Sequence, residues 1–290
     1  MMSKNIIPVL CCSSEKNNNQ FIYKDDQPAV KFVASPRGVS QDGVKFYKPD
    51  DKIPEENRTW RDLVLEQKHN NLVPAYLLYK RDIYRELYNE FRGQFYILSA
   101  GWGIIRADFK IPAYDITYST AGDMPEYVKR TDNYGYKDIN HLKDDFSKLG
   151  RDTEVILFAP YDYVRPFCNM TQSIPFNKKT IKFRSKKIHN DFLLLGKKGY
   201  DFDYFPDGGP HDWFYKAAEV FLNDYTKAHP VMPDGNISFQ QSFSYFGFQS
   251  PPLNQKELHR AYREMINKDH YDKKDINAMY IRALEYFNPR

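Results

Sequence analysis

The stretch Ile6-Ile7-Pro8-Val9-Leu10-Cys11-Cys12 decides the fold class. It is a continuous apolar run that stops at the polar residues 13–19, which is typical of a buried strand followed by a loop. Two further apolar runs, at residues 95–100 and 154–159, stop in the same way before Gly101 and at Pro160. Because helical stretches separate these runs, we expect an α/β fold with a mostly parallel sheet flanked by helices.

The remaining chain predicts further helices and one polar excursion. The helices are expected after Thr59, from Pro74 to a stop at Gly93, and over residues 211–229, 254–268 and 274–287. Residues 20–58 are mixed and polar, and short apolar runs at 29–33 and 44–47 predict a hairpin. We therefore expect one α/β domain over residues 1–290, with an inserted excursion at about 17–58 and a helical C-terminal region at about 254–290.

The composition excludes several classes of protein. The 290 residues carry 42 Lys and Arg against 38 Asp and Glu, and a formal charge of +4 is too small for a uniformly basic surface. An aromatic content of 16% at this length can bury an ordinary core, which excludes wholesale disorder. No apolar run approaches the ~18 residues of a membrane span. The three cysteines make no disulfide framework and lie at no metal-ligand spacing from a histidine. We expect a cytoplasmic protein with no membrane partner, no metal and no cofactor.

Three loops at predicted strand ends are the first candidates for a ligand site, because ligands bind beyond the carboxyl ends of parallel strands. The loops follow Cys12, Leu98 and Phe158, and they offer hydroxyls, a lysine, carboxylates, aromatic rings and glycines that allow close backbone approach. The candidates for lining a pocket are Ser13, Lys16, Ser99, Trp102, Tyr114, Tyr161 and Tyr163. The alternative is that glycine and proline merely end the strands here.

The same residues carry a family resemblance. The motifs are Cys12-Ser13 with Lys16 downstream, Leu98-Ser99-Ala100-Gly101-Trp102-Gly103-Ile104-Ile105, and Pro112-Ala113-Tyr114-Asp115. In scattered blocks over about residues 6–165, the chain resembles the YaaA-like superfamily, whose members are linked to peroxide stress, DNA protection or base modification. The resemblance implies association with nucleic acid and an α/β fold similar to that of some DNA glycosylases.

A basic segment at residues 177–189 bears on nucleic acid independently, because it contains no acidic residue. On a strand, Ile181 and Phe183 would face the core, while Lys182 and Arg184 would project from the opposite face. Such a ribbon can hold backbone phosphates, and its candidate contacts are Lys178, Lys179, Lys182, Arg184, Lys186 and Lys187. The alternative is a solvated edge strand that its lysines protect from aggregation.

Candidate acids and bases lie in two places. His211 and Asp212 follow a Gly-Gly-Pro turn at the start of a predicted helix, where they could form a His/Asp pair or simply cap the helix. Cleavage of an N-glycosidic bond needs a carboxylate, a proton donor for the departing base, and rings that hold the base. Asp115, beside Tyr114, is the first choice of carboxylate, and Asp162, Asp207 and Asp212 are alternatives.

Several other chemistries lack their motifs. The chain has no dinucleotide-binding G-x-G-x-x-G, no P-loop, no H-E-x-x-H and no G-x-S-x-G. The leading hypothesis is a DNA-acting hydrolase, an N-glycosylase that removes a modified base from DNA; the hydrolysis step and a role in anti-phage defence depend on the resemblance. The alternatives are a non-catalytic DNA-binding stress protein and a nucleotide- or base-modifying enzyme. The base, the strand preference and the oligomeric state stay open.

Overall fold

A computed structural model describes most of the chain. The described residues are 6–17, 20–25, 27–119, 124–131, 136–184, 199–207, 209, 212–228, 243, 246–248, 252, 254–266, 277, 279–280, 283–284 and 287. The chain divides into two compact units, Met1–Glu219 and Val220–Arg290, which we describe separately. Whether the two units form one domain, as the sequence predicts, stays a prediction.

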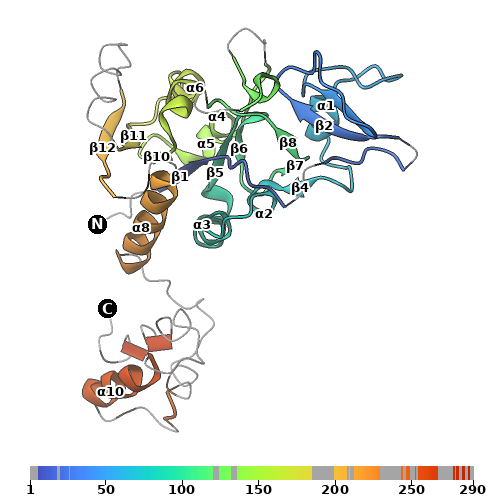
Figure 1. The fold of residues 1–290 in the computed structure, drawn as a ribbon. Helices are drawn as coiled ribbons and strands as arrows, with labels where there is room; N and C mark the ends of the chain where they lie inside the picture. Colours follow the sequence, from blue (N-terminus) through green and yellow to red (C-terminus); the bar gives the residue numbers. More distant parts are fainter. Residues whose placement is uncertain are drawn as a thin grey trace. The chain divides into compact units, whose positions relative to one another are not determined.

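The first unit is built on a central sheet, which has seven strands within the described residues (Figure 1). In spatial order these are β12 (Asp201–Tyr204), β11 (Lys178–Phe183), β10 (Glu154–Phe158), β1 (Ile6–Cys11), β5 (Tyr96–Ser99), β6 (Gly103–Arg106) and β9 (Ile139–Asn140). The first five run parallel, β6 runs antiparallel to β5, and β9 runs parallel to β6. The predicted α/β fold with a mostly parallel sheet is confirmed.

The order of the strands creates a switch point next to β1. The chain passes from β1 to β5 on one side, and later strands continue on the other side through β10, β11 and β12. Taken in chain order, the five parallel strands are arranged 2-1-3-4-5, one of the common orders of doubly wound sheets. β1 lies in the middle and its side chains are buried on both faces, with Val9 and Leu10 fully inaccessible. In such sheets, ligands bind between the first and third strands at their carboxyl ends.

Helices cover the sheet, with α3 and α6 on opposite sides in Figure 1. The helices of this unit are α1 (Trp60–Leu65), α2 (Ala75–Leu78), α3 (Ile83–Phe91), α4 (His141–Asp144), α5 (Phe146–Leu149), α6 (Tyr161–Thr171) and the beginning of α8 (Trp213–Ala228), with short 3₁₀ turns at Arg92–Gln94 and Glu126–Val128. The helix expected after Thr59 is confirmed as α1, which Thr59 and Asp62 close with a reciprocal capping box.

The single helix predicted from Pro74 to Gly93 is wrong, because the chain breaks between α2 and α3. Tyr79 is extended, and it forms an isolated bridge with Lys16. Asn17 N–H donates to the Leu78 carbonyl and Lys80 N–H donates to the Glu15 carbonyl. The loop that follows β1 thus takes the backbone groups that a continuous helix would have used.

The hairpin predicted at residues 29–33 and 44–47 is also wrong, although both strands exist. β2 (Ala29–Val33) and β3 (Val44–Tyr47) pair in parallel, and β8 (Tyr114–Asp115) joins β2 on its other side. A separate antiparallel pair joins β4 (Val73–Pro74) to β7 (Lys110–Ile111). Phe32 on β2 packs against Trp60 and Trp102, so the polar excursion has an aromatic core of its own that continues into the main sheet.

Helix α6 was not predicted, because Pro166 lies inside it. A proline has no N–H to donate to the carbonyl four residues earlier, which here is that of Asp162. The helix nevertheless begins directly after Pro160. Tyr161, Asp162 and Tyr163, expected in a loop, therefore occupy its first turn.

The second unit contains the end of α8 and also α10 (Gln255–Ile266), which lies where residues 254–268 predict a helix. Leu258 on α10 belongs to a small apolar cluster with Phe243, Phe246 and Ala283. The helix expected at 274–287 falls mostly outside the described residues. None of the helices described in either unit is long and apolar enough to cross a membrane.

Candidate functional site

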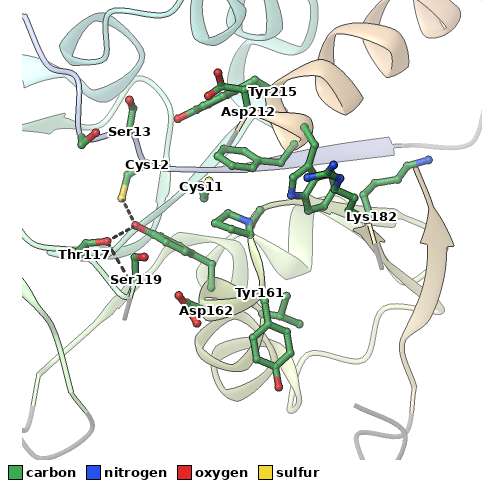
Figure 2. Close-up of a pocket in the computed structure, with 18 of the residues that line it drawn as sticks. Cys11, Cys12, Ser13, Thr117, Ser119, Tyr161, Asp162, Lys182, Asp212 and Tyr215 are labelled. Carbon is green, nitrogen blue, oxygen red and sulfur yellow. Dashed lines mark hydrogen bonds between the residues drawn. The ribbon is translucent and has the colours of Figure 1, made fainter. Parts of the chain in front are cut away.

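A pocket of about 640 Å³ lies at the switch point of the sheet (Figure 2). Its walls come from the carboxyl ends of β1, β10 and β11, from the first turn of α6, and from the beginning of α8. Among the sequence-predicted residues, those that line it are Ser13, Tyr161, Asp162, Tyr163, Lys182, Arg184 and Asp212. All of these residues belong to the first unit.

Cys12 and Tyr163 form the base of the pocket. The Cys12 thiol accepts the Ala100 N–H at 3.4 Å and lies 3.3 Å from the Tyr163 hydroxyl. Thr117 Oγ1 is 3.3 Å from the same hydroxyl, as the dashed lines in Figure 2 show. Burial raises the pKa of Tyr163, so its hydroxyl stays protonated at neutral pH. These contacts fix the end of β1 against α6 and against the segment that carries Thr117.

A buried polar cluster supports the loop after β1. Ser99 Oγ donates to the Tyr114 hydroxyl at 2.8 Å, and that hydroxyl is 2.8 Å from the Tyr79 hydroxyl. Lys16 Nζ donates to the Ser13 carbonyl at 2.9 Å and lies 4.5 Å from the centre of the Tyr114 ring. The structure thus brings the predicted residues Lys16, Ser99 and Tyr114 together, but it places them outside the pocket lining.

The Lys16 ammonium is almost completely buried, with 6% of the residue exposed. Burial lowers the pKa of Lys16, while the charges of neighbouring groups, among them Asp115, oppose the shift. Its contact with the face of Tyr114 offsets part of the loss of solvation. Lys16 therefore shapes the loop that presents Ser13, and it does not reach the pocket itself.

The structure separates the candidate carboxylates. Asp115, the first choice from the sequence, lies on β8, pairs with Lys31 at 3.2 Å and does not line the pocket. Asp212 does line it and pairs with Arg81 at 2.8 Å, and Asp162 lines it from the first turn of α6. In Figure 2, Asp212 lies on the wall opposite Asp162. His211, the predicted partner of Asp212, lies outside the described residues.

Arg81 was not predicted, because the sequence places it inside a helix. Its guanidinium lies 4.2 Å from the centre of the Tyr215 ring while one nitrogen binds Asp212. Its Nε is buried and makes no hydrogen bond to any of the described residues. Arg81, Asp212 and Tyr215 therefore form one wall of the pocket, on which a ring, a cation and an anion are in contact. The part that Arg81 plays in this wall becomes visible only in the structure, where the break before α3 contacts the beginning of α8.

The basic segment is less free than its sequence indicates. Lys178 pairs with Glu154 at 2.7 Å, Lys182 pairs with Asp203, and buried Lys179 donates to the Thr171 carbonyl at 2.8 Å. The alternative of an edge strand is wrong, because β11 lies between β10 and β12.

Among the described cations of the basic segment, Lys182 and Arg184 line the pocket, and Phe183 lies between them. Ile181 and Phe183 are buried, as the strand pattern predicts. Arg184 makes no ion pair with the residues that the structure describes. Lys186 and Lys187 lie outside the described residues.

The predicted stacking rings divide between pocket and core. Tyr161 lines the pocket and is 42% exposed, whereas Trp102 is fully buried against Phe32. The pocket has further rings from Trp213, Phe214 and Tyr215, which an aromatic helix pattern does not distinguish from core residues. Within the described residues, no group of three or more His, Cys, Asp or Glu side chains could hold a metal ion.

Comparisons with protein-family models, curated proteins and solved structures find no match for this chain. The YaaA-like resemblance therefore stays a prediction that depends on the quoted motifs. The motifs meet in one region: Ser13 follows β1 and accepts a hydrogen bond from Lys16, Ser99 ends β5, and the Tyr114 hydroxyl accepts from Ser99 and bonds the Tyr79 hydroxyl. Their proximity gives them a shared structural role in supporting the loop that borders the pocket.

Proposed function

We propose that the pocket binds one nucleotide of a DNA strand and that the chain hydrolyses the N-glycosidic bond of a modified base. The observation that carries the proposal is the joint presence of rings, carboxylates and cations in one pocket at the switch point of a doubly wound sheet. If the released base is one that phage DNA carries, the activity serves in defence.

The size and lining of the pocket suit a nucleotide. A volume of about 640 Å³ lies within the range of small-ligand pockets, roughly 300–1,000 Å³. Tyr161, which is 42% exposed, offers a ring for a base, and Arg184 offers a cation for a phosphate. A base in a duplex must leave the stack to enter such a pocket, and rings that replace its stacking lower the cost.

Asp212 is the carboxylate that we assign to the reaction. In hydrolysis, a water oxygen forms a bond to C1′ while the bond from C1′ to the base nitrogen breaks. The electron pair of that bond goes to the base, which takes up a proton from solvent, while Asp212 accepts the proton of the attacking water and then releases it to solvent. The same carboxylate stabilises positive charge that develops on the sugar. The ion pair with Arg81 holds Asp212 in position for this role.

The test is incubation of the purified chain with duplex and single-stranded DNA that carry a panel of modified bases. We expect release of a free base, detected by mass spectrometry, and alkali-labile sites at the modified positions. Binding of these DNAs without any release would favour the DNA-binding stress protein and overturn the proposed reaction.

A second candidate is an enzyme that acts on free nucleotides or bases. The observation in its favour is the state of the pocket cations: Arg81 and Lys182 are paired, and Arg184 alone has no ion-pair partner among the described residues. One free cation suits a single phosphate better than a polymer. Release or modification of the base from free mononucleotides, at rates above those with DNA, would favour this candidate.

A further inference from the structure

The second unit contains a pocket of about 520 Å³ with no part in the proposed reaction. It is lined by Lys256, His259, Tyr262, Arg263 and Tyr280. Four of these residues lie on α10, where positions 256, 259 and 263 share one face of the helix. The lining therefore combines two cations, a histidine and two aromatic rings.

The helix separates its residue types into stripes. Leu258 is fully buried in the apolar cluster of the unit, and Ala261 and Met265 pack against that cluster. The acidic residues Glu257 and Glu264 occupy a different stripe, seven residues apart. The row that carries Lys256 and Arg263 therefore does not face the apolar cluster, and it contains no acidic residue.

Lys256 and Arg263 are exposed and make no ion pair with a described carboxylate. By contrast, Arg260 on the same helix pairs with Glu264 at 3.0 Å. Lys256 and Arg263 are separated by seven residues, about 10 Å along the helix axis at 1.5 Å per residue. In a stacked strand the phosphates follow one another every ~3.4 Å along the axis, and in an extended strand they are farther apart, so a separation of about 10 Å suits two different phosphates of one strand.

Two half-buried rings, Tyr262 and Tyr280, form a platform beside these cations, and both also pack against the apolar cluster of the unit. Tyr262 and Tyr280 stack with their centres 4.1 Å apart and their planes 22° from parallel. The Tyr280 hydroxyl forms a hydrogen bond with His259 Nδ1, which holds the imidazole beside the rings, and burial raises the pKa of Tyr280.

We propose that this pocket binds a segment of single-stranded nucleic acid, with its phosphates on Lys256 and Arg263 and a base against the tyrosine platform. Cations that track a backbone and rings on which bases stack are the two components of sequence-tolerant single-strand binding. A duplex keeps its bases stacked inside, and an acidic peptide has no bases to stack. The inference goes beyond the proposed reaction and rests on it only for the choice of DNA over RNA.

The experiment compares the salt dependence of binding of an unmodified thymidine oligonucleotide to the full chain and to K256Q/R263Q. Loss of two phosphate contacts should reduce the slope of log K against log salt by about 1.4, at roughly 0.7 per contact for a single strand. Between 50 and 200 mM salt, the intact chain should then lose about sevenfold more affinity than the variant. Both residues are exposed, so circular dichroism should show unchanged folding.

The matched control is K227Q/R260Q, which removes the same charge from the same unit. Lys227 and Arg260 are paired with Asp224 and Glu264, and neither lines the pocket. The control should keep the slope of the intact chain. Equal slopes for all three proteins would overturn the inference, and so would an equal reduction of the slope in both variants. Displacement of the bound oligonucleotide by polyglutamate as effectively as by unlabelled oligonucleotide would also overturn it.

This experiment is independent of the proposed reaction, because the oligonucleotide has no modified base to release. A chain that binds through this pocket but releases no base from modified DNA would overturn the reaction alone. A chain that releases a base while K256Q/R263Q binds like the control would overturn the pocket alone.

Discussion

Replacing Gly103 by alanine should destabilise the first unit more than the same replacement of Gly150, which also has a positive φ. Gly103 begins β6 with φ +95°, a conformation that residues with a Cβ rarely adopt. A Cβ placed there would lie 2.2 Å from the Ile139 carbonyl oxygen and 2.9 Å from the Ile139 nitrogen. Both are backbone atoms of the neighbouring strand β9, so no side-chain rotation relieves the contact.

The magnitude has two parts. Backbone strain at such a φ costs about 1–3 kcal/mol. Forcing β9 away adds about 1–3 kcal/mol, the usual cost of overpacking. Gly150 provides the control, because its φ is +81° but a Cβ there would meet no atom within 4 Å. Gly150→Ala should therefore show the strain alone, and Gly103→Ala should cost about 1–3 kcal/mol more.

The assay is unfolding in urea followed by tryptophan fluorescence. The three tryptophans, Trp60, Trp102 and Trp213, all belong to the first unit, so the signal reports that unit. Trp102 is fully buried and directly precedes Gly103. If the two alanine variants unfold at the same urea concentration, the steric reasoning about β6 and β9 is refuted.

Three further predictions concern the site. Asp212→Asn should reduce base release by about 100-fold or more, and equal release by the variant in a timed assay would remove Asp212 from the mechanism. The substitution should change the free energy of unfolding by less than about 1 kcal/mol, because the ion pair with Arg81 is partly exposed. Asp115→Asn should leave base release unchanged, since Asp115 pairs with Lys31 outside the pocket, and a tenfold loss in the same assay would return it to consideration. Burial lowers the pKa of Lys16, so the unfolded chain binds the ammonium proton more tightly than the folded chain does. The free energy of unfolding should therefore rise with pH from the lowered pKa up to about 10.4. In urea unfolding at several pH values, Lys16→Met should lack this rise, and an identical rise in the variant would show that Lys16 is not its source.

The sheet was predictable from the sequence because its central strands are continuous apolar runs. Residues 6–12, 95–100 and 154–159 correspond to β1, β5 and β10, and each is buried on both faces. Such a pattern needs no knowledge of the neighbours. The direction of β2 and β3 was not predictable, because the same two apolar runs fit an antiparallel or a parallel pair.

The candidate site was predictable only in its location. The rule that ligands bind at the carboxyl ends of parallel strands indicated Ser13 and Tyr161, and both line the pocket. It could not distinguish a residue in the pocket from one behind it, and Ser99 and Trp102 lie behind it. Arg81 had no local signal, since its role comes from contacts with Asp212 and Tyr215, more than 130 residues further along the chain.

The basic segment shows why a local charge pattern is a poor guide to free charge in a sheet. Lys178 and Lys182 have no acidic neighbours in sequence, yet Glu154 on β10 and Asp203 on β12 pair with them across the sheet. An interior strand has a paired strand on each side that can supply an acidic partner. A residue beyond the end of a strand, or on an exposed helix face, has no such paired strands. Arg184, which follows β11, and the α10 pair Lys256 and Arg263 are in that second position. If the chain binds nucleic acid, each of these three cations should therefore contribute to the salt dependence, and removing the charge of Lys178 should leave the slope unchanged.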